Sequence, residues 1–381
     1  MDPGIVERMM RVSVLVGLAC VVTPCIAQTV SSVGVLPGGS NSDAFAVSRN
    51  GLAVVGRSDS SNGTRAFLWT ATGGMQDLGQ LAGSIYSEAF GVSDDGTVVV
   101  GRTYVGSLDN PRAFRWTAST GMVDLGTLPG GQKAAANGVS GSGNVVVGWS
   151  ESASGNKGFE WTSASGMQAT PDLVPGSGTY SYAVNGDGTV IAGSAGSLSG
   201  LRPFRWSAAT GTTDLGVLSG GTYGEGTGVS ADGKAVVGFS DSTIGNQAIR
   251  WMASTGLLGL GLLPGGTFSY AHGVTDGGEG VVGWGNGNLG RGYAFVWTRA
   301  SGMQTLADLL NARGVDLTGI EFTRARAISP DGRFIVGTGI NNGVRGFLVD
   351  LGAVPIPGPG AIAVAWLPWC LRNRRRTSAP T

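Results

Sequence analysis

Short Val-rich runs alternate with Gly-, Ser- and Asp-containing stretches along most of the chain. One unit, residues 89–126, has four runs with the composition of short strands, at residues 89–93, 97–101, 113–117 and 121–126. Asp94-Asp95-Gly96 separates the first two runs and is typical of a tight hairpin turn, in which Gly adopts a positive φ. Four strands in about 45 residues predict a propeller blade, because a β-solenoid coil needs fewer residues per turn.

The same unit recurs along the chain, and three markers define its period. The first is a Trp in the third strand, spaced by 45 to 47 residues, at Trp69, Trp116, Trp161, Trp206, Trp251 and Trp297. The second is a Gly that closes the Val-rich run, at Gly56, Gly101, Gly148, Gly193, Gly238, Gly283 and Gly337. The third is a turn Gly, at Gly51, Gly96, Gly143, Gly188, Gly233, Gly278 and Gly332. Seven repeats, with Val349 at the last Trp position, predict an all-β, seven-bladed β-propeller of four-stranded blades.

The two ends of the repeat array predict how the ring closes. Residues 32–39 (SVGVLPGG) match the end of a repeat and form an orphan fourth strand before the first unit. The last unit has three strands and stops near Gly352. We therefore expect the N-terminal strand to complete the last blade, which removes the exposed sheet edges. Residues 303–316 depart from the repeat and have the apolar spacing of a short helix ending at Gly314, inserted on one face of the ring.

The repeat motif resembles a known family. The segment 65–70 (RAFLWT), followed by Gly-Met-x-Asp-Leu-Gly and Leu-Pro-Gly-Gly, is similar to the HAF-type extracellular repeat proteins of bacteria. The resemblance covers roughly residues 30–352. The His of that motif is absent, and Arg65, Arg112 and Tyr293 stand at matching positions. The resemblance implies export and assigns no activity.

The N-terminal residues 1–27 are predicted to be a signal peptide. Arg8 and Arg11 precede an apolar run at residues 12–22, which is too short to span a bilayer comfortably. Small residues near Ala27 suit signal peptidase, so we expect cleavage after Ala27 and an extracellular or cell-surface location. The alternative is a buried apolar strand. Residues 28–352 then form the propeller domain.

The C-terminal residues 353–381 form a separate tail. Proline-containing residues 354–358, a short apolar stretch and a terminal arginine cluster resemble the PEP-CTERM sorting tails. This resemblance implies exosortase-type processing and a place in an extracellular matrix. Ile356 replaces the central Glu of that motif, and Pro368 interrupts the apolar stretch. The alternative is a disordered tail.

Composition narrows the classes of function. Apolar residues make up 41% of the chain, which argues against disorder, and the net charge is zero with no basic stripe, which argues against a nucleic-acid partner. Cys20, Cys25 and Cys370 all lie outside the repeats, so the body lacks disulfides, thiolate metal sites and a Cys nucleophile. With His272 as the single histidine, we expect no metal and no cofactor. A calcium site at the Asp-Gly turns is the alternative to plain hairpin turns there, and one Asp per turn favours the turns.

Two registers supply candidate ligand-binding residues. The repeated third-strand Trp is interpreted as blade packing rather than sugar stacking. Trp149 and Trp284 occupy a second-strand position that varies between blades, so they are candidates for a ligand surface. A first-strand register suited to the channel holds Phe45, Phe90, Asn137, Tyr182, Thr227, His272 and Arg326. Tyr182, His272 and Arg326 are its candidate functional members, and the alternative is a packing layer with three polar tips.

Three functions remain open from the sequence. The preferred one is a monomeric, exported, non-catalytic module that binds polysaccharide or a surface protein in an extracellular matrix. The second is a polysaccharide hydrolase or lyase that uses carboxylates with Tyr182, His272 and Arg326 at the channel mouth. The third is a structural surface spacer without a ligand.

Overall fold

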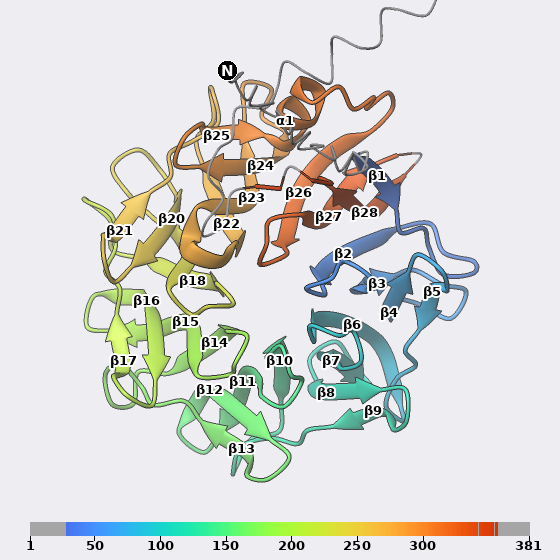
Figure 1. Cartoon of the computed structure of the whole chain (residues 1–381). Helices are drawn as coiled ribbons and strands as arrows, with labels where there is room; N and C mark the ends of the chain where they lie inside the picture. Colours follow the sequence, from blue (N-terminus) through green and yellow to red (C-terminus); the bar gives the residue numbers. More distant parts are fainter. Residues whose placement is uncertain (1–27, 342, 354, 357–381) are drawn as a thin grey trace, which may run out of the picture.

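The protein folds into a closed ring of β-sheets around a central axis (Figure 1). The computed structural model describes residues 28–341, 343–353, 355 and 356. The predicted signal peptide, residues 1–27, and most of the predicted tail, residues 357–381, lie outside the described residues. Seven antiparallel sheets of four strands each surround the axis, which confirms the predicted seven-bladed β-propeller.

Within each blade the strands run outward from the axis in chain order. Blade one contains β2 (Ser42–Val47), β3 (Val54–Ser58), β4 (Arg65–Thr70) and β5 (Gly74–Asp77). Blade two contains β6 (Ser84–Val92), β7 (Val99–Val105), β8 (Pro111–Thr117) and β9 (Gly121–Asp124). Blade three contains β10 (Ala134–Val139), β11 (Val146–Ser152), β12 (Gly155–Thr162) and β13 (Gly166–Ala169). Blade four contains β14 (Thr179–Val184), β15 (Val190–Ser197), β16 (Gly200–Ser207) and β17 (Gly211–Asp214).

The remaining three blades follow the same plan, with one change in the last. Blade five contains β18 (Gly224–Val229), β19 (Ala235–Ser240), β20 (Gln247–Met252) and β21 (Gly256–Gly259). Blade six contains β22 (Ser269–Val274), β23 (Gly280–Asn286), β24 (Gly292–Thr298) and β25 (Gly302–Thr305), with the 3-10 turn η1 (Asp276–Gly278) between its first two strands. Blade seven contains β26 (Glu321–Ile328), β27 (Phe334–Ile340), β28 (Val344–Asp350) and, as its outermost strand, β1 (Thr29–Ser32).

The closure of the ring is as predicted, but the closing strand lies earlier in the chain. β1 pairs with β28, with Val30 opposite Val349, so the N-terminal segment completes the last blade (Figure 1). The predicted strand at residues 32–39 is wrong in position, because β1 ends at Ser32. Gly34 has a φ of 78° and turns the chain away from the sheet, as Gly126 does after β9 with a φ of 77°.

The turns between the first two strands of each blade are held by their own side chains. In blade two, Asp95 Oδ1 accepts hydrogen bonds from Ser93 Oγ at 2.6 Å and from the Thr97 backbone N–H at 3.0 Å. Gly96 adopts a φ of 78°, which the hairpin requires. Asp187, Asp232 and Asp331 also accept side-chain hydrogen bonds inside their own turns, as expected for the predicted hairpin turns.

The repeated Gly of the second strand creates the space for the core of each blade. At this Gly, a Cβ atom would lie between 1.9 and 2.1 Å from the carbonyl oxygen of a first-strand residue in all seven blades. A β-bulge in the first strand brings this carbonyl close. The same Gly also faces a third-strand aromatic ring, such as Phe159 beside Gly148. This third-strand position, which the sequence analysis did not single out, holds a buried side chain in every blade, aromatic in six blades and Ile in blade five, at Phe67, Phe114, Phe159, Phe204, Ile249, Phe295 and Phe347.

The repeated Trp lies two residues after this buried side chain and packs between blades. Trp116 and Trp297 are buried, each 6% exposed, in clusters that join neighbouring sheets. The other four are partly buried against equivalent clusters. The interpretation of this Trp as blade packing is therefore confirmed.

The helix that interrupts the repeat is present but shorter than predicted. The helix α1 spans Leu306–Ala312, and residues 303–305 belong instead to β25. Thr305 caps the helix by accepting a hydrogen bond from the Asp308 backbone N–H at 3.0 Å, and Gly314 ends it with a φ of 78°. Buried Leu306 and Leu310 anchor α1 between blades six and seven (Figure 1).

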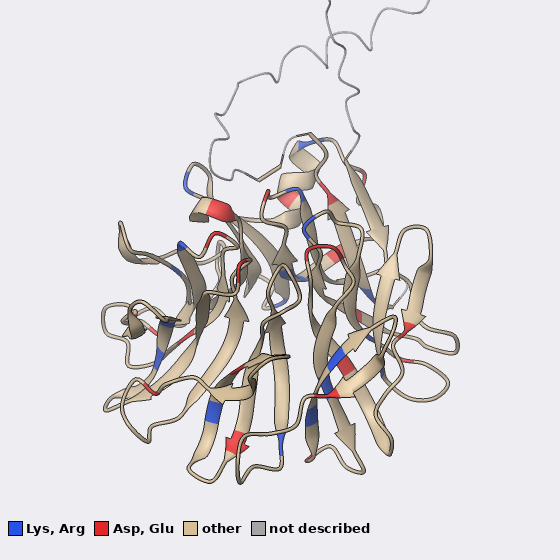
Figure 2. Ribbon diagram, turned by 60° about the horizontal axis from the view of Figure 1, so that its bottom comes forward, with Lys and Arg blue, Asp and Glu red and all other residues tan. Residues whose placement is uncertain are grey.

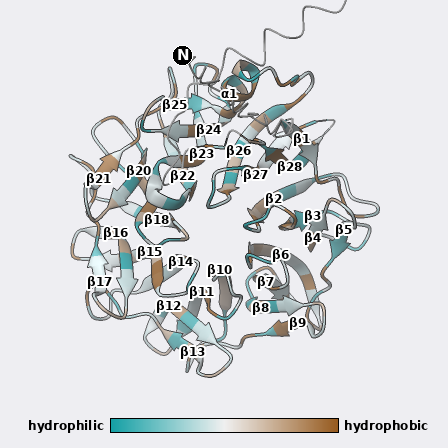
Figure 3. Cartoon of the chain, in the orientation of Figure 1, coloured by the Kyte–Doolittle hydropathy of each residue, from teal (hydrophilic) through white to brown (hydrophobic). Residues whose placement is uncertain are grey.

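Charge is sparse over this fold. Figure 2 shows acidic and basic residues thinly spread over a ribbon that is mostly neutral. Figure 3 shows short hydrophilic and hydrophobic bands within single strands, as expected when alternate residues face different layers.

Within the described residues, no helix is long and apolar enough to cross a membrane. Ile356, at the end of the described chain, is buried against blades six and seven.

Candidate functional site

A cavity of about 630 Å³ occupies the centre of the ring. Seven innermost strands line it, and each contributes the register predicted to face the channel. All seven members of this register line the cavity, namely Phe45, Phe90, Asn137, Tyr182, Thr227, His272 and Arg326. The structure thus brings Tyr182, His272 and Arg326 together around one space, from blades four, six and seven.

One end of the cavity is apolar. Its lining there comes from the last residue of each innermost strand, at Val47, Val92, Val139, Val184, Val229, Val274 and Ile328. Beyond these residues, Arg49 reaches from blade one over the axis, with Nε 2.7 Å from Asp94 Oδ2 and Nη1 3.9 Å from Asp276 Oδ2. Arg49 Nη2 also lies beside Gly186 of blade four, across the ring. This end, called the turn end below, is therefore obstructed by a guanidinium group.

The opposite end is polar and is called the mouth. It is formed in each blade by a first-strand position, four residues before the apolar residue of the turn end, and by the cross-strand partner of that position. The seven pairs are Asp43 with Arg57, Glu88 with Arg102, Ala135 with Trp149, Tyr180 with Ser194, Glu225 with Phe239, Tyr270 with Trp284, and Arg324 with Thr338. Trp149 and Trp284 thus lie at the mouth, and neither lines the central cavity itself.

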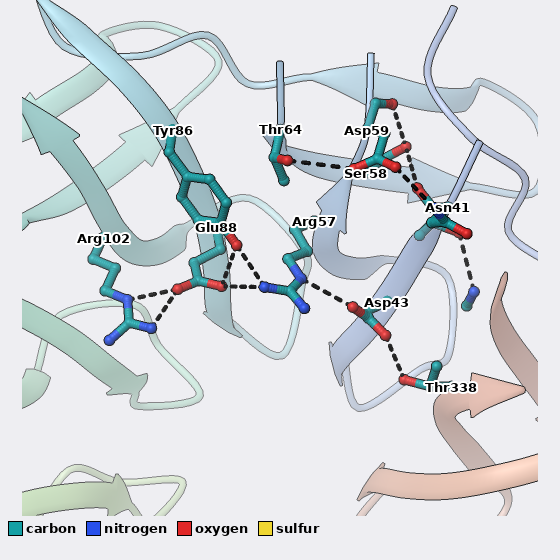
Figure 4. A network of polar contacts seen from close by, with 12 residues as sticks. Asn41, Asp43, Arg57, Ser58, Asp59, Thr64, Tyr86, Glu88, Arg102 and Thr338 are labelled. Atoms are coloured by element: carbon teal, nitrogen blue, oxygen red, sulfur yellow. Dashed lines mark hydrogen bonds and ion pairs between the residues drawn. The ribbon is translucent and has the colours of Figure 1, made fainter. Parts of the chain in front are cut away.

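Blades one and two give the mouth an ionic half (Figure 4). Buried Glu88, 2% exposed, receives Arg102 Nη2 at 2.5 Å and Arg57 Nη1 at 3.4 Å. Arg57 also contacts Asp43 at 2.9 Å and the Tyr86 hydroxyl at 2.5 Å. Burial, and then the neighbouring Glu88 carboxylate, raise the pKa of Tyr86 to about 12. Both carboxylates of this half are therefore neutralised by guanidinium groups.

Blades three to six give the mouth an aromatic half, called the aromatic wall below. Its members are half-buried rings, at Trp149, Tyr180, Tyr182, Tyr223, Phe239, Phe268, Tyr270 and Trp284. Tyr270 stacks on Trp284 with ring centroids 5.4 Å apart, and Phe239 meets Tyr270 edge-on at 4.6 Å. The Tyr180 ring meets the Trp149 ring edge-on, with ring centroids 6.3 Å apart, and stacks on the Tyr182 ring, with ring centroids 6.4 Å apart. The ring contacts form two groups, one on blades three and four and one on blades five and six, and each presents apolar faces with polar edges.

Sequence reasoning found the two Trp residues and Tyr182 of this wall but missed the other members. Tyr180, Glu225 and Tyr270 occupy the register two residues before the channel-facing one, and Phe268 and Tyr223 lie two residues earlier again. The signal was the alternation of strand residues, which places positions i and i−2 on one face. Applying it to the channel register would have predicted the mouth as well.

The channel residues have electrostatic surroundings that favour neutral His and Tyr. Burial, and then the positive charges of Arg326 and Arg324, lower the pKa of His272 to about 3. Burial, and then the Glu225 carboxylate beside it, raise the pKa of Tyr182 to about 12. At neutral pH both side chains are therefore uncharged hydrogen-bonding groups.

We expect His272 to make the protein sensitive to acid. The pKa of His272 in the folded protein lies below the ordinary value of about 6.5. Between these two pH values the imidazole is therefore protonated in the unfolded chain and neutral in the folded protein. The free energy of unfolding should fall as the pH drops from about 6.5 towards 3, with about 2 kcal/mol lost by pH 4.5. Urea denaturation at pH 7 and pH 4.5 measures this loss.

The His272→Gln variant isolates this contribution from that of the carboxylates, including nearby Glu225. The variant should lose less stability than the wild type over the same pH range. Equal losses for the two proteins would contradict the assignment.

Within the described residues, no group of three or more His, Cys, Asp or Glu side chains is arranged to hold a metal ion.

The closed ring and its lined axis define a seven-bladed β-propeller with a central cavity. No family model and no curated protein matches the chain. A structure of oligogalacturonate lyase in complex with manganese is similar, with a TM-score of 0.55 and 12% identity, covering 85% of this chain and 93% of that one. An oligogalacturonate lyase from Vibrio parahaemolyticus has a TM-score of 0.54 and 9% identity, covering 85% and 94%.

TolB from Acinetobacter baumannii is a more distant structural neighbour. It has a TM-score of 0.43 and 11% identity, and the match covers 68% of this chain. The chain spans 61% of the length of that protein. At these identities the two oligogalacturonate lyase structures show a shared propeller fold and nothing further.

Proposed function

We propose that this protein is an extracellular, non-catalytic module that binds a polysaccharide at the mouth of its propeller. The aromatic wall is the observation that carries this proposal. Its half-buried rings are held by one another and by the sheets, so their exposed faces are preorganised to pack against sugar rings. Hydroxyl and carboxylate groups at the edges of the wall, on Tyr182 and Glu225, supply the few polar contacts that orient a ligand.

Export is part of the same proposal. The signal-peptide pattern of residues 1–27 supports passage through the membrane, and the tail pattern of residues 353–381 supports exosortase-type sorting. A polysaccharide in a surface matrix is the partner that fits this location. A surface protein is the other partner that the mouth could hold.

A polysaccharide hydrolase or lyase is the second candidate function. The observation in its favour is the Glu225 carboxylate, which contacts Tyr223 and lies beside Tyr182 in the cavity. Against it, Glu88 and Asp43 are held in ion pairs with arginines, which hinders either acid from serving as a proton donor or nucleophile. The binding module therefore accounts for more of the mouth.

We expect the full chain to bind glycans reversibly and without cleavage. Replacing Trp284 with alanine should weaken the affinity by about tenfold, because it removes the ring on which Tyr270 stacks. A glycan array identifies the ligand, calorimetry measures affinity, and product analysis detects cleavage.

The control for this experiment is Leu52→Ala, which removes an exposed apolar side chain at the turn end. It should leave the affinity unchanged. Equal loss in both variants would place the ligand elsewhere, and release of shortened glycans would establish the enzyme instead.

A further inference from the structure

We propose that Arg324 and Arg326 of blade seven, with His272 of blade six, form a subsite for a carboxylate, so that the bound glycan is an acidic one containing uronic-acid residues. This inference rests on the proposed function, because it assumes that a glycan occupies the mouth. It adds the chemical class of that glycan.

The two arginines differ from the other arginines of the mouth in their partners. Arg57 and Arg102 are held by Asp43 and Glu88. In the part of the chain that the structure describes, no carboxylate lies within ion-pair distance of Arg324 or Arg326. Among those same described residues, the buried Nε atom of Arg326 has no hydrogen-bond partner. Two guanidinium groups therefore face the mouth with N–H groups that are available to a ligand.

Aromatic rings hold both guanidinium groups in place. The Arg324 guanidinium lies 4.7 Å from the centre of the Trp284 ring, and that of Arg326 lies 5.6 Å from the Phe45 ring. A stacked, planar guanidinium keeps its N–H fork free at the edges, where it can bind a carboxylate with two parallel hydrogen bonds. The subsite is therefore preorganised without a direct ion pair, because among the described residues Asp43 and Glu88 act on Arg326 only from beyond ion-pair distance.

His272 completes the subsite with an uncharged group. Its Nε2 atom is buried and has no hydrogen-bond partner within the described residues, and its side chain lines the central cavity together with Arg326. Burial, and then the neighbouring Arg324, lower the pKa of Arg326 to about 10, so this arginine stays protonated at neutral pH. The charge at the subsite is thus positive, and a carboxylate would offset the repulsion between the two guanidinium groups.

The arrangement places this charge beside the sugar-binding surface. Trp284 and Arg324 line a second cavity of about 570 Å³ between blades six and seven. Glu321 also lines this cavity and is paired with Arg291 at 3.9 Å, which leaves Arg324 available. A pyranose ring stacked on Trp284 or Tyr270 would therefore present an adjacent carboxylate to Arg324. A neutral sugar would leave the two cations unpaired.

The test compares matched acidic and neutral ligands on the full chain. The probes are uronic-acid oligosaccharides, the same oligosaccharides after reduction of their carboxyl groups to alcohols, and sulfated oligosaccharides. We expect the wild type to bind a uronic-acid probe at least about tenfold more tightly than its reduced form. The doubly substituted Arg324→Gln, Arg326→Gln variant should lose this difference and still bind the reduced form. Arg202→Gln, which removes an arginine from blade four, should keep the difference.

Each outcome separates the inference from the function on which it rests. Equal binding of the acidic and reduced probes, or selectivity that survives in the double variant, would overturn the carboxylate subsite and leave the glycan module standing. Preference for sulfated probes over carboxylated ones would overturn it too. Binding of no glycan would overturn both. If the double variant does not fold, Arg324→Gln alone decides, because Arg324 is exposed.

Discussion

Replacing Gly193 with alanine is expected to lower the free energy of unfolding by about 3 kcal/mol or more. Gly193 lies in β15, and a Cβ atom there would lie 1.9 Å from the carbonyl oxygen of Tyr180 and 2.8 Å from the Phe204 ring. The nearest obstacle is backbone, which cannot turn aside as a side chain does. The bulged first strand would have to move away from the second. Urea denaturation followed by circular dichroism measures the change.

Gly211→Ala is the matched control, since it changes the same pair of residue types in the same blade. Gly211 begins β17 with a φ of 68°, and no heavy atom lies within 4 Å of its Cβ position. Only the backbone conformation opposes this substitution, which should cost about 1 kcal/mol. Similar losses at the two positions would show that steric contact is not the reason for the repeated Gly.

Removing the Glu88 side chain is the second change with a large expected effect. The Glu88→Ala variant should lose about 3 kcal/mol of stability, because two guanidinium groups and the Tyr86 hydroxyl lose their common partner (Figure 4). Arg57 and Arg102 are each partly exposed, so water compensates for part of the loss. The midpoint of urea denaturation at pH 7 reports the effect.

Glu321→Ala provides the comparison for an exposed ion pair. Glu321 and Arg291 are 60% and 69% exposed, and their charged atoms are 3.9 Å apart. Loss of this ion pair should therefore change the free energy of unfolding by less than about 0.5 kcal/mol. Glu88→Gln should fall between the two variants, because the amide retains the shape and one acceptor oxygen. A Glu88→Ala protein as stable as the Glu321→Ala protein would contradict the role assigned to the network.

The repeat made the fold predictable because each marker answers a local requirement. Gly96 enables a hairpin turn, Trp116 fills the space between sheets, and Gly101 permits a bulged strand to approach. A period of about 45 residues with four strands leaves few architectures other than a propeller. Strand boundaries were less predictable. β1 ends at Ser32 because Gly34 turns the chain, a local choice that the repeat pattern did not reveal in advance.

The candidate site was predictable in part. The register containing Tyr182, His272 and Arg326 could be assigned to the channel, since a position that alternates with small residues on the innermost strand faces the axis. The pairing partners of those residues could not be assigned. Arg57 meets Glu88 of the next blade, 31 positions along the chain, and Thr338 meets Asp43, 295 positions away.

The sequence by itself determined the number of blades, the strand order within them and the closure by an N-terminal strand. These depend on residues that are near one another in the chain or that repeat at a fixed period. Only the tertiary structure decided that Arg49 obstructs one end, that aromatic rings gather on blades three to six, and that Arg324 and Arg326 form no ion pair with an acid of the described residues. Those properties arise where residues of different blades meet around the axis. Ring closure, which no single repeat encodes, decides which of these residues become neighbours.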